Sequence, residues 1–319
     1  MRGLLLLVCA ADGFSVLRPV SRRAPVMRSE ADESSFSDYE QPSDTGDYFD
    51  VDATVVVDVV AMRTALLLKA AASSRGQSAS SAVLRADVAE LAAALESTAA
   101  PPTLDMACGR WALAFCETQL FRSSPFWMAG RATCTDGDEA RRYEWFCEMH
   151  RAATGVSEIG AVRQLISRDL LVSEFETTVA AFPAAPLTVT GTIVSAAEIV
   201  GVVEAEGALT FELLQDTVEV KGSNVPGLRT ALDAGLKLDS RALADALAGA
   251  GALPDVPRPM FLTTYVDDCI RISRDLPDRN LFIYVKESDD PTPTSFEDVS
   301  ADLGLVKLFS GLFGALSQP

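Results

Sequence analysis

The sequence predicts a mainly β protein, an antiparallel barrel or sandwich that follows two helices and carries a helical insertion and a C-terminal helix. Three observations support this prediction. Short apolar segments with a period of two residues crowd the chain after residue 110, and small or turn-forming residues separate them. Before them, two segments of helical character end at Pro101 and Pro102. Hydrophobic residues make up 48% of the 319 residues, which is enough for a sizeable core.

The N-terminal residues have the composition of targeting segments. Arg2 followed by a short apolar run is the pattern of a signal peptide over residues 1–13. Residues 14–29 begin with Phe14, are basic and contain no acidic residue, which is typical of a transit peptide. This order resembles the two-part presequences of plastids acquired by secondary endosymbiosis, and an ordinary secretory signal with a basic mature start is the alternative. We therefore expect a plastid (chloroplast) protein.

Two further segments differ in composition from the body of the chain. Residues 30–54 are acidic and contain no basic residue, which predicts a disordered linker. Residues 287–319 begin with an acidic, proline-containing stretch and continue with an apolar helical face over 299–316. This helix is expected either to dock on the domain or to lie on a lipid surface. The folded domain is expected over residues 55–286, with a helical insertion at 228–250.

Two helices are expected at the start of the folded domain. Residues 55–72 are apolar with sparse charge. Residues 80–97 place four apolar side chains near helical spacing, and two acids near their start suit the helix dipole. The stretch 73–78 between them is rich in serine and holds a glycine, so it is predicted to be a turn.

The strand candidates share short length, apolar character and flanking turn residues. They are 111–116, 164–176 as a pair, 187–193, 199–204, 209–213, 217–221, 261–274 and 281–286. Residues 277–280 form the turn before the last of them. Within 261–274, strict alternation places Phe261, Tyr265, Cys269 and Arg271 on one face and Leu262, Val266, Ile270 and Ile272 on the other.

The charge balance restricts the possible partners. The chain has 27 basic and 45 acidic residues and a net charge of −18. A nucleic-acid partner is not expected, because phosphate binding needs a basic face. The same charge gives no polybasic attraction to anionic membranes. The longest apolar run, residues 4–11, is shorter than the about 20 residues that span a bilayer, so no transmembrane span is expected.

Nothing in the sequence points to a catalytic or metal site. The single histidine, His150, excludes multi-histidine metal sites, and the six cysteines are scattered without a CxxC pair, so reduced and mostly structural thiols are expected. Cys147 and His150 lie three residues apart and can meet as a thiolate pair on one helical face. The neighbouring Trp145 and Phe146 indicate core packing instead. We expect no enzyme, no cofactor and no bound metal.

Four short motifs follow one another along the chain. They are Leu-Leu-Leu-Lys at 66–69 with Ser-Arg-Gly-Gln-Ser-Ala-Ser at 74–80, Gly-Arg-Trp-Ala-Leu-Ala-Phe at 109–115, Ser-Ser-Pro-Phe-Trp at 123–127, and Thr-Tyr-Val-Asp-Asp-Cys-Ile-Arg-Ile-Ser-Arg at 264–274 with Asn-Leu-Phe-Ile-Tyr-Val-Lys at 280–286. In this order they resemble the plastid lipid-associated protein or fibrillin (plastoglobulin) family, and the last motif is the most specific. Together they span residues 66–286. The resemblance agrees with the plastid presequence expected from composition.

The resemblance implies a lipocalin-like barrel in plastids, associated with plastoglobules or thylakoids, that holds or coats lipid, carotenoid, quinone or fatty acid. A soluble plastid carrier of one hydrophobic ligand is the alternative, and an enzyme of prenyl-lipid or fatty-acid metabolism is a further one. The chain also departs from the family pattern. Phe115 and Cys116 stand where a Tyr-Thr pair is commoner, and residues 134–162 and 228–250 match nothing in it.

The candidate ligand-binding residues are Trp111, Phe115, Phe126, Trp127, Tyr265 and Arg271. Aromatic side chains supply the apolar wall of a lipid pocket, although they equally suit a packed core, and Trp111 is expected to be buried in either case. Arg271 can bind the carboxylate or headgroup of a ligand if its strand face is interior. The alternative for Arg271 is a salt bridge to Asp267 or Asp268.

Overall fold

The computed structural model describes most of the chain after residue 57. The described residues are 58–78, 82–155, 157–180, 188–205, 207–233, 237–251, 253, 255–299 and 302. The targeting segments expected over 1–29, the linker over 30–54 and most of the helix expected over 299–316 lie outside the described residues.

The strands of the described residues form one closed antiparallel barrel, which confirms the predicted fold class. β1 to β5 pair in chain order, β5 pairs with β7, β7 to β9 again pair in order, and β9 returns to β1. Eight of the nine described strands take part, and closure leaves them without an exposed edge. The bounds are β1 (Gly109–Cys116), β2 (Ser157–Ile166), β3 (Leu170–Ala180), β4 (Thr188–Ala205), β5 (Ala208–Lys221), β6 (Lys237–Asp239), β7 (Met260–Val266), β8 (Ile270–Asp275) and β9 (Leu281–Ser288).

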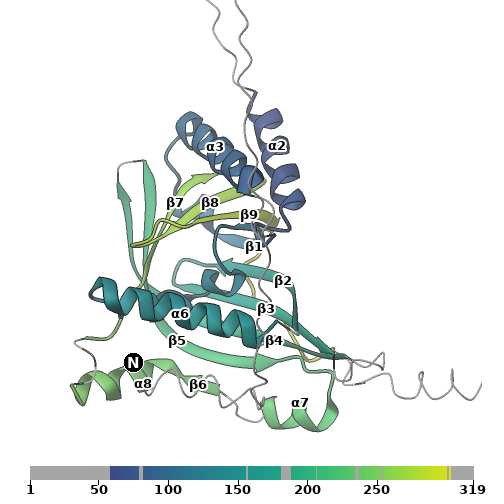
Figure 1. Cartoon of the computed structure of the whole chain (residues 1–319), viewed down its shortest axis with the longest axis vertical. Coiled ribbons are helices and arrows are strands. Elements are labelled where there is room, and N and C mark those ends of the chain that lie inside the picture. The colour runs from purple at the N-terminus through teal and green to yellow at the C-terminus, as the bar shows by residue number, and fades with distance from the viewer. Residues whose placement is uncertain are drawn as a thin grey trace, which may run out of the picture. The chain divides into compact units, whose positions relative to one another are not determined.

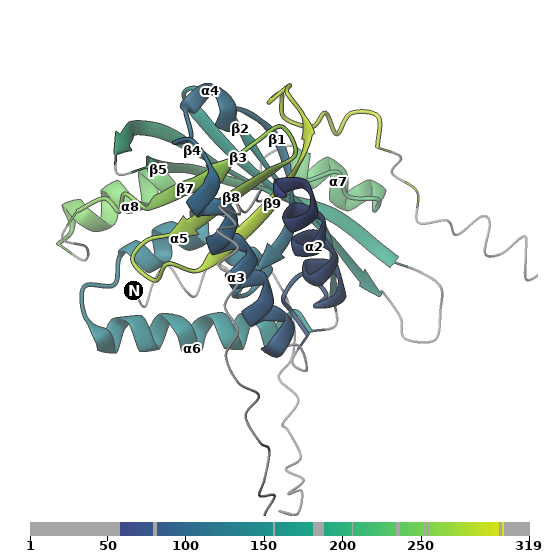
Figure 2. The ribbon, with the colours of Figure 1, turned by 90° about the horizontal axis from the view of Figure 1, so that it is seen from above.

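Helices lie around this barrel, as Figure 1 shows. They are α2 (Val59–Ala72), α3 (Ala82–Thr98), α4 (Leu104–Ala107), α5 (Pro125–Ala132), α6 (Gly137–Ala153), α7 (Pro226–Asp233) and α8 (Ser240–Gly249), with a 3₁₀ turn η1 (Leu120–Ser123) before α5. In Figure 2, α4 lies above the strands and α6 below them. None of the described helices has the length and apolar character needed to cross a membrane.

The first two helices cover the outer face of β7, β8 and β9. Leu66 and Leu95 pack there against Ile270, Ile272 and Ile283 in one buried cluster. Both helices are therefore held by apolar burial, and the outer face of these strands is buried beneath them.

The turn after α2 fastens this helix pair to β1. Gly76 has a φ of +85°, and a Cβ there would lie 2.2 Å from the carbonyl oxygen of Cys116, so only glycine fits. Arg75 donates hydrogen bonds to the carbonyl oxygens of Ile159 and Gly160 at 2.8 Å each. The Arg-Gly turn of the first family-like motif therefore attaches the helix pair to β1 and β2.

Two strand limits differ from the sequence-based expectation. β4 and β5 run unbroken where the pattern suggested four short strands, because β-bulges at Ala196–Ala197 and at Ile199–Gly201 absorb the small residues that resembled turns. The candidate 261–274 is two strands instead of one. Its turn is closed by Asp267, whose Oδ1 accepts the backbone N–H groups of Cys269 and Ile270 at 2.7 Å each.

The expected insertion at 228–250 lies between β5 and β7. It consists of α7 and α8 on either side of the three-residue strand β6, which pairs with β5 at Thr217–Glu219. The segment that matched nothing, 134–162, contains α6 and the start of β2.

Candidate ligand site inside the barrel

Arg271 on β8 points into the barrel. Its neighbours Ile270 and Ile272 pack outside beneath α2 and α3, so alternation places Arg271 on the inner face. Its side chain is 0% exposed. A fully buried cation in an apolar enclosure is the least common arrangement for arginine, and it directs attention to its partners.

The partners of Arg271 come from three other strands. Its Nη2 donates to Oε1 of Gln164 on β2 at 2.5 Å. Its Cζ lies 4.2 Å from the ring centroid of Tyr284 on β9 and 5.4 Å from that of Trp111 on β1. The two aromatic faces give cation–π stabilisation, which is stronger in a desolvated setting.

Two nitrogen atoms of Arg271 remain without a hydrogen-bond partner among the described residues. These are Nε and Nη1, both buried. No carboxylate of the described residues forms an ion pair with Arg271. Burial lowers the pKa of Arg271 to about 10, a shift that Tyr284 opposes, so the guanidinium is still charged at neutral pH.

Other polar side chains share the interior with Arg271. Thr263 and Ser273 form a hydrogen bond of 3.1 Å between their hydroxyl oxygens. Gln164 donates from Nε2 to the carbonyl oxygen of Ser123 in η1 at 2.7 Å. The hydroxyl of Ser173 on β3 is buried without a partner among the described residues.

An apolar cluster surrounds this polar group. Its members that lie on strands are Trp111, Leu113, Cys116, Val162, Phe175, Val266, Phe282 and Tyr284. The interior therefore combines an apolar wall with one deeply buried cation, the composition of a pocket for an amphipathic molecule.

The structure brings together some of the six sequence candidates. Trp111 is 0% exposed, as expected, and its ring faces Arg271. Trp127 on α5 joins the same apolar cluster, and Phe126 packs against it.

Two of the candidate ligand residues, Phe115 and Tyr265, do not lie with Arg271, although alternation within 261–274 placed Tyr265 on the same face as Arg271. Both lie in the outer cluster beneath α2 and α3, on the opposite side of the sheet from Arg271. In each case a β-bulge precedes the aromatic residue, between Leu113 and Phe115 in β1 and between Thr263 and Tyr265 in β7. Because a bulge adds one extra residue to the strand, the side chain that follows points to the opposite face of the sheet.

The alternative role for Arg271, an ion pair with Asp267 or Asp268, is not found among the described residues. Asp267 belongs to the outer face, where its Oδ2 accepts from Arg63 at 2.9 Å and from the Tyr265 hydroxyl at 2.8 Å. Burial works against the charge of Asp267, but the hydrogen bonds from the backbone N–H groups of its turn and from Tyr265 and Arg63 together outweigh burial and lower its pKa.

Sequence reasoning did not select Gln164, Tyr284 or Lys286 for this site. Phe282, Tyr284 and Lys286 are spaced two residues apart along β9, so all three lie on one face of the strand. The sequence predicts that they share this face, but not that the face points inward. Gln164 carried no signal, because a single glutamine in a strand usually faces solvent.

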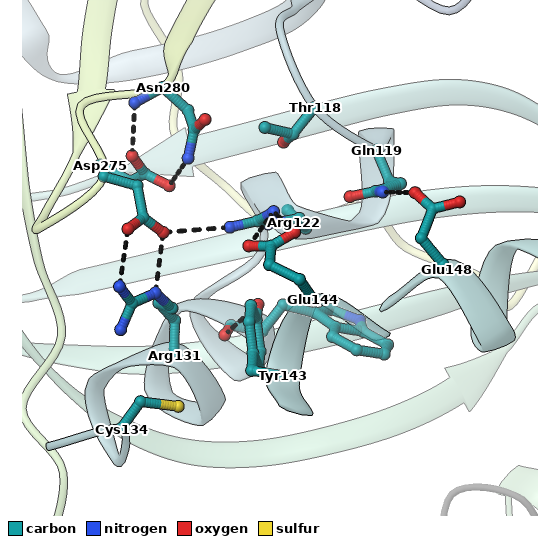
Figure 3. Close-up of polar contacts among 12 residues, drawn as sticks. Thr118, Gln119, Arg122, Arg131, Cys134, Tyr143, Glu144, Glu148, Asp275 and Asn280 are labelled. Carbon is teal, nitrogen blue, oxygen red and sulfur yellow. Dashed lines mark hydrogen bonds and ion pairs between the residues drawn. The ribbon is translucent and has the colours of Figure 1, made fainter. Parts of the chain in front are cut away.

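A second polar cluster closes the barrel end at the β8–β9 turn (Figure 3). Arg122 in η1 is 4% exposed and forms an ion pair with Glu144 on α6 at 2.8 Å. Asp278 in the turn accepts from Arg122 at 3.3 Å and from Arg131 on α5 at 2.7 Å. The turn, η1, α5 and α6 are thus held together across this end.

The Cys147–His150 pair lies on α6 and shows no sign of an activated thiol. Burial raises the pKa of Cys147 to about 11, so the thiol is protonated at neutral pH. The His150 ring lies edge-on to Phe121, 4.7 Å between centroids. Among the described residues, no group of His, Cys, Asp and Glu is arranged to hold a metal ion, and all five cysteines are free thiols.

Comparisons with known proteins add no relative to this description. No family model, no curated protein and no solved structure matches the chain.

Proposed function

We propose that the barrel binds one hydrophobic molecule that carries an acidic end, and that this end binds Arg271. The observation that supports the proposal is the fully buried guanidinium with two donors, Nε and Nη1, left without a partner among the described residues. An unpaired buried charge costs several kcal/mol. A ligand carboxylate beside these donors removes that cost through charge-assisted hydrogen bonds.

The apolar wall around Arg271 suits the rest of such a ligand. Trp111, Phe175 and Phe282 supply aromatic surface on three different strands. Burial of an alkyl or isoprenoid chain against them contributes about 0.8 kcal/mol per CH₂ group. A long-chain fatty acid is the simplest molecule that combines this chain with a single carboxylate.

The test is a titration with a fluorescent long-chain fatty acid and with the corresponding neutral alcohol. Arg271→Met is expected to weaken fatty-acid binding by about 2–5 kcal/mol, the scale for removing one partner of a buried charge pair. Binding of the alcohol should change little. Arg274→Met is the matched control, because Arg274 lies on the same strand but faces outward to Glu96.

Two outcomes contradict the proposal. Fatty-acid affinity that is unchanged in a folded Arg271→Met protein would remove Arg271 as the anchor. Equal losses for the acid and the alcohol would show that the substitution alters the packing of the barrel instead of the recognition of charge.

We further propose that the chain works in plastids as a lipid-associated protein of plastoglobules or thylakoids, in a binding and not a catalytic role. The four family-like motifs and the composition of residues 1–29 support this setting. Fusion of residues 1–35 to a fluorescent reporter should direct it to the plastid of an alga with a secondary plastid, and Phe14→Ala should prevent entry to the stroma. Secretion of the unmodified fusion would contradict the plastid setting.

The soluble carrier and the lipid-surface protein are separated by fractionation. Flotation of the full chain with lipid globules supports the surface role. A single lipid that copurifies with soluble protein, identified by native mass spectrometry and extraction, supports the carrier. An enzymatic role would need a lipid-directed activity that substitution of Cys147 or His150 abolishes.

A further inference from the structure

The two ends of β9 lie in different surroundings. At the start of β9, the β8–β9 turn is held to η1 and α5 through Asp278 and its two arginine partners, Arg122 and Arg131. Figure 3 labels both arginines. This end is closed by several interlocked ion pairs. At the other end of β9, Lys286 takes the inward position after Phe282 and Tyr284.

Lys286 connects the interior with solvent. Its Cα pairs with that of Trp111 across β1 and β9, and its Nζ lies 5.3 Å from the Trp111 ring centroid. Its side chain is 18% exposed, and its Nζ forms an ion pair of 2.5 Å with Asp289, whose side chain is 90% exposed. α4 precedes β1 at this end, where the Ala107 carbonyl oxygen accepts from Trp111 Nε1 at 2.9 Å.

A series of neighbouring side chains therefore leads from the exposed Asp289 to the buried guanidinium. It passes from the exposed Asp289 to Lys286, from Lys286 to the buried Trp111 ring, and from that ring to Arg271. Two cations approach the same indole, one near the surface and one fully buried. The outer cation has an exchangeable partner, because an ion pair with an exposed carboxylate contributes only about 0–1 kcal/mol.

The charge of the whole protein makes this outer cation more significant. With a net charge of −18, the protein repels a free carboxylate at long range. A cation at the entrance offsets that repulsion locally and raises the rate of association, an effect that depends on ionic strength.

We infer that the ligand enters at the end of the barrel marked by Lys286, and that Lys286 exchanges Asp289 for the acidic end of the ligand before that end reaches Arg271. This inference rests on the proposed function and assigns a separate role to each cation. Lys286 determines how fast an acidic ligand associates, and Arg271 determines how slowly it leaves.

The experiment is stopped-flow binding of the fluorescent fatty acid to the full chain at low and at high salt. Lys286→Met should lower the association rate about threefold to tenfold at low salt, near the lower end of the range known for electrostatic steering. The difference should shrink at high salt, because salt screens the exposed charge. Asp289→Asn should raise the association rate, since it removes the competing carboxylate.

The controls separate local from global charge. Lys237→Met removes the same charge on β6, where Lys237 is 53% exposed, and should leave the association rate unchanged. Lys286→Arg keeps the charge and should keep the rate, which excludes a purely structural effect of the substitution at this position. Thermal melting of each variant confirms that the proteins compared are folded.

Equal association rates for Lys286→Met and Lys237→Met would overturn the entrance role of Lys286. In that case fatty-acid binding by the wild type and its loss in Arg271→Met would still support the proposed function. No fatty-acid binding by the wild type would overturn both.

Discussion

Two buried arginines in one protein have opposite surroundings. Arg122 is 4% exposed and has Glu144 and Asp278 as ion-pair partners, and its Cζ lies 5.2 Å from the Tyr143 ring centroid. Arg271 is 0% exposed and has one neutral hydrogen-bond partner and two aromatic rings. Both guanidiniums therefore lie over aromatic faces, but only Arg122 has carboxylates.

The pKa values of the two side chains follow this difference. Burial alone would lower the pKa of Arg122, but the acidic groups around it, led by Tyr143 and Glu144, outweigh burial and raise the pKa. For Arg271 burial dominates, and the pKa falls to about 10. Arg122 shows how this protein compensates a buried cation that serves the fold. Arg271 lacks the carboxylate partners that Arg122 has, and its Nε and Nη1 have no hydrogen-bond partner among the described residues.

The largest expected effect concerns the ring that Arg271 and Lys286 share. Trp111→Ala should lower the free energy of unfolding by about 3–5 kcal/mol, the cost of truncating a large buried side chain. Denaturant unfolding followed by circular dichroism measures it. Trp145→Ala is the control, because Trp145 is 64% exposed on α6, and its loss should have little effect. Equal stability of the two variants would contradict the packing described for the barrel interior.

The second prediction compares the two arginines directly. Arg122→Met should cost about 3 kcal/mol of unfolding free energy, because it leaves Glu144 without its cation and Asp278 with Arg131 as its remaining partner. Arg271→Met should be neutral or stabilising, since it replaces an unpaired buried charge by an apolar side chain of similar length. Urea titrations of both variants test this. A loss for Arg271→Met as large as that for Arg122→Met would identify Arg271 as a structural residue.

The third prediction addresses the partner of Arg122 on the β8–β9 turn. Asp278→Asn removes the ion pairs to Arg122 and Arg131, and we expect a loss of about 1 kcal/mol, because Asp278 is 27% exposed and water screens the pair. The loss should decrease as salt is added. Asp138→Asn is the control, since Asp138 is 70% exposed and pairs with the exposed Arg141. Thermal melting at two ionic strengths gives both results.

The sequence was sufficient to predict the fold class but not which face of each strand is inward. Strand alternation and the turn at 277–280 indicated an antiparallel barrel or sandwich, the family resemblance implied the barrel, and the closed order of strands confirms the barrel. The amino-acid composition gives no sign of the bulges before Phe115 and Tyr265, so the sequence grouped both residues with Trp111 and Arg271 as candidate ligand contacts. Local pattern cannot reveal one extra residue that only the pairing of two strands defines.

Arg271 itself was selected from the sequence, but its surroundings were not predictable. Its neighbours Ile270 and Ile272 are apolar although they face away from the barrel interior, because α2 and α3 cover the outer face of β8. When both faces of a strand are buried, period-two alternation no longer distinguishes inside from outside. The partners Gln164 and Tyr284 come from strands far away in sequence, and only barrel closure brings them to Arg271.

The smallest expected effect is the pH dependence of the cluster around Arg122. Asp275 lies beside this cluster, and its Oδ1 and Oδ2 accept from the backbone N and Nδ2 of Asn280 at 2.7 Å each (Figure 3). Burial raises the pKa of Asp275 above its ordinary value, and the hydrogen bonds from Asn280 only partly oppose it. The folded state therefore binds this proton more tightly than the unfolded state.

Stability should rise as pH falls from neutral through the raised pKa of Asp275, in contrast to the effect of a carboxylate whose pKa is lowered. Asp275→Asn should remove this contribution, so the difference in unfolding free energy between wild type and variant should change as pH rises from the ordinary pKa of aspartate, about 3.9, through the raised pKa of Asp275. Asp138→Asn, at an exposed ion pair, serves as the reference for the overall acid response of the protein. A pH-independent difference between wild type and Asp275→Asn would show that Asp275 titrates as it does in the unfolded chain. The burial of charge at this end of the barrel would then rest on Arg122 and its two ion-pair partners alone.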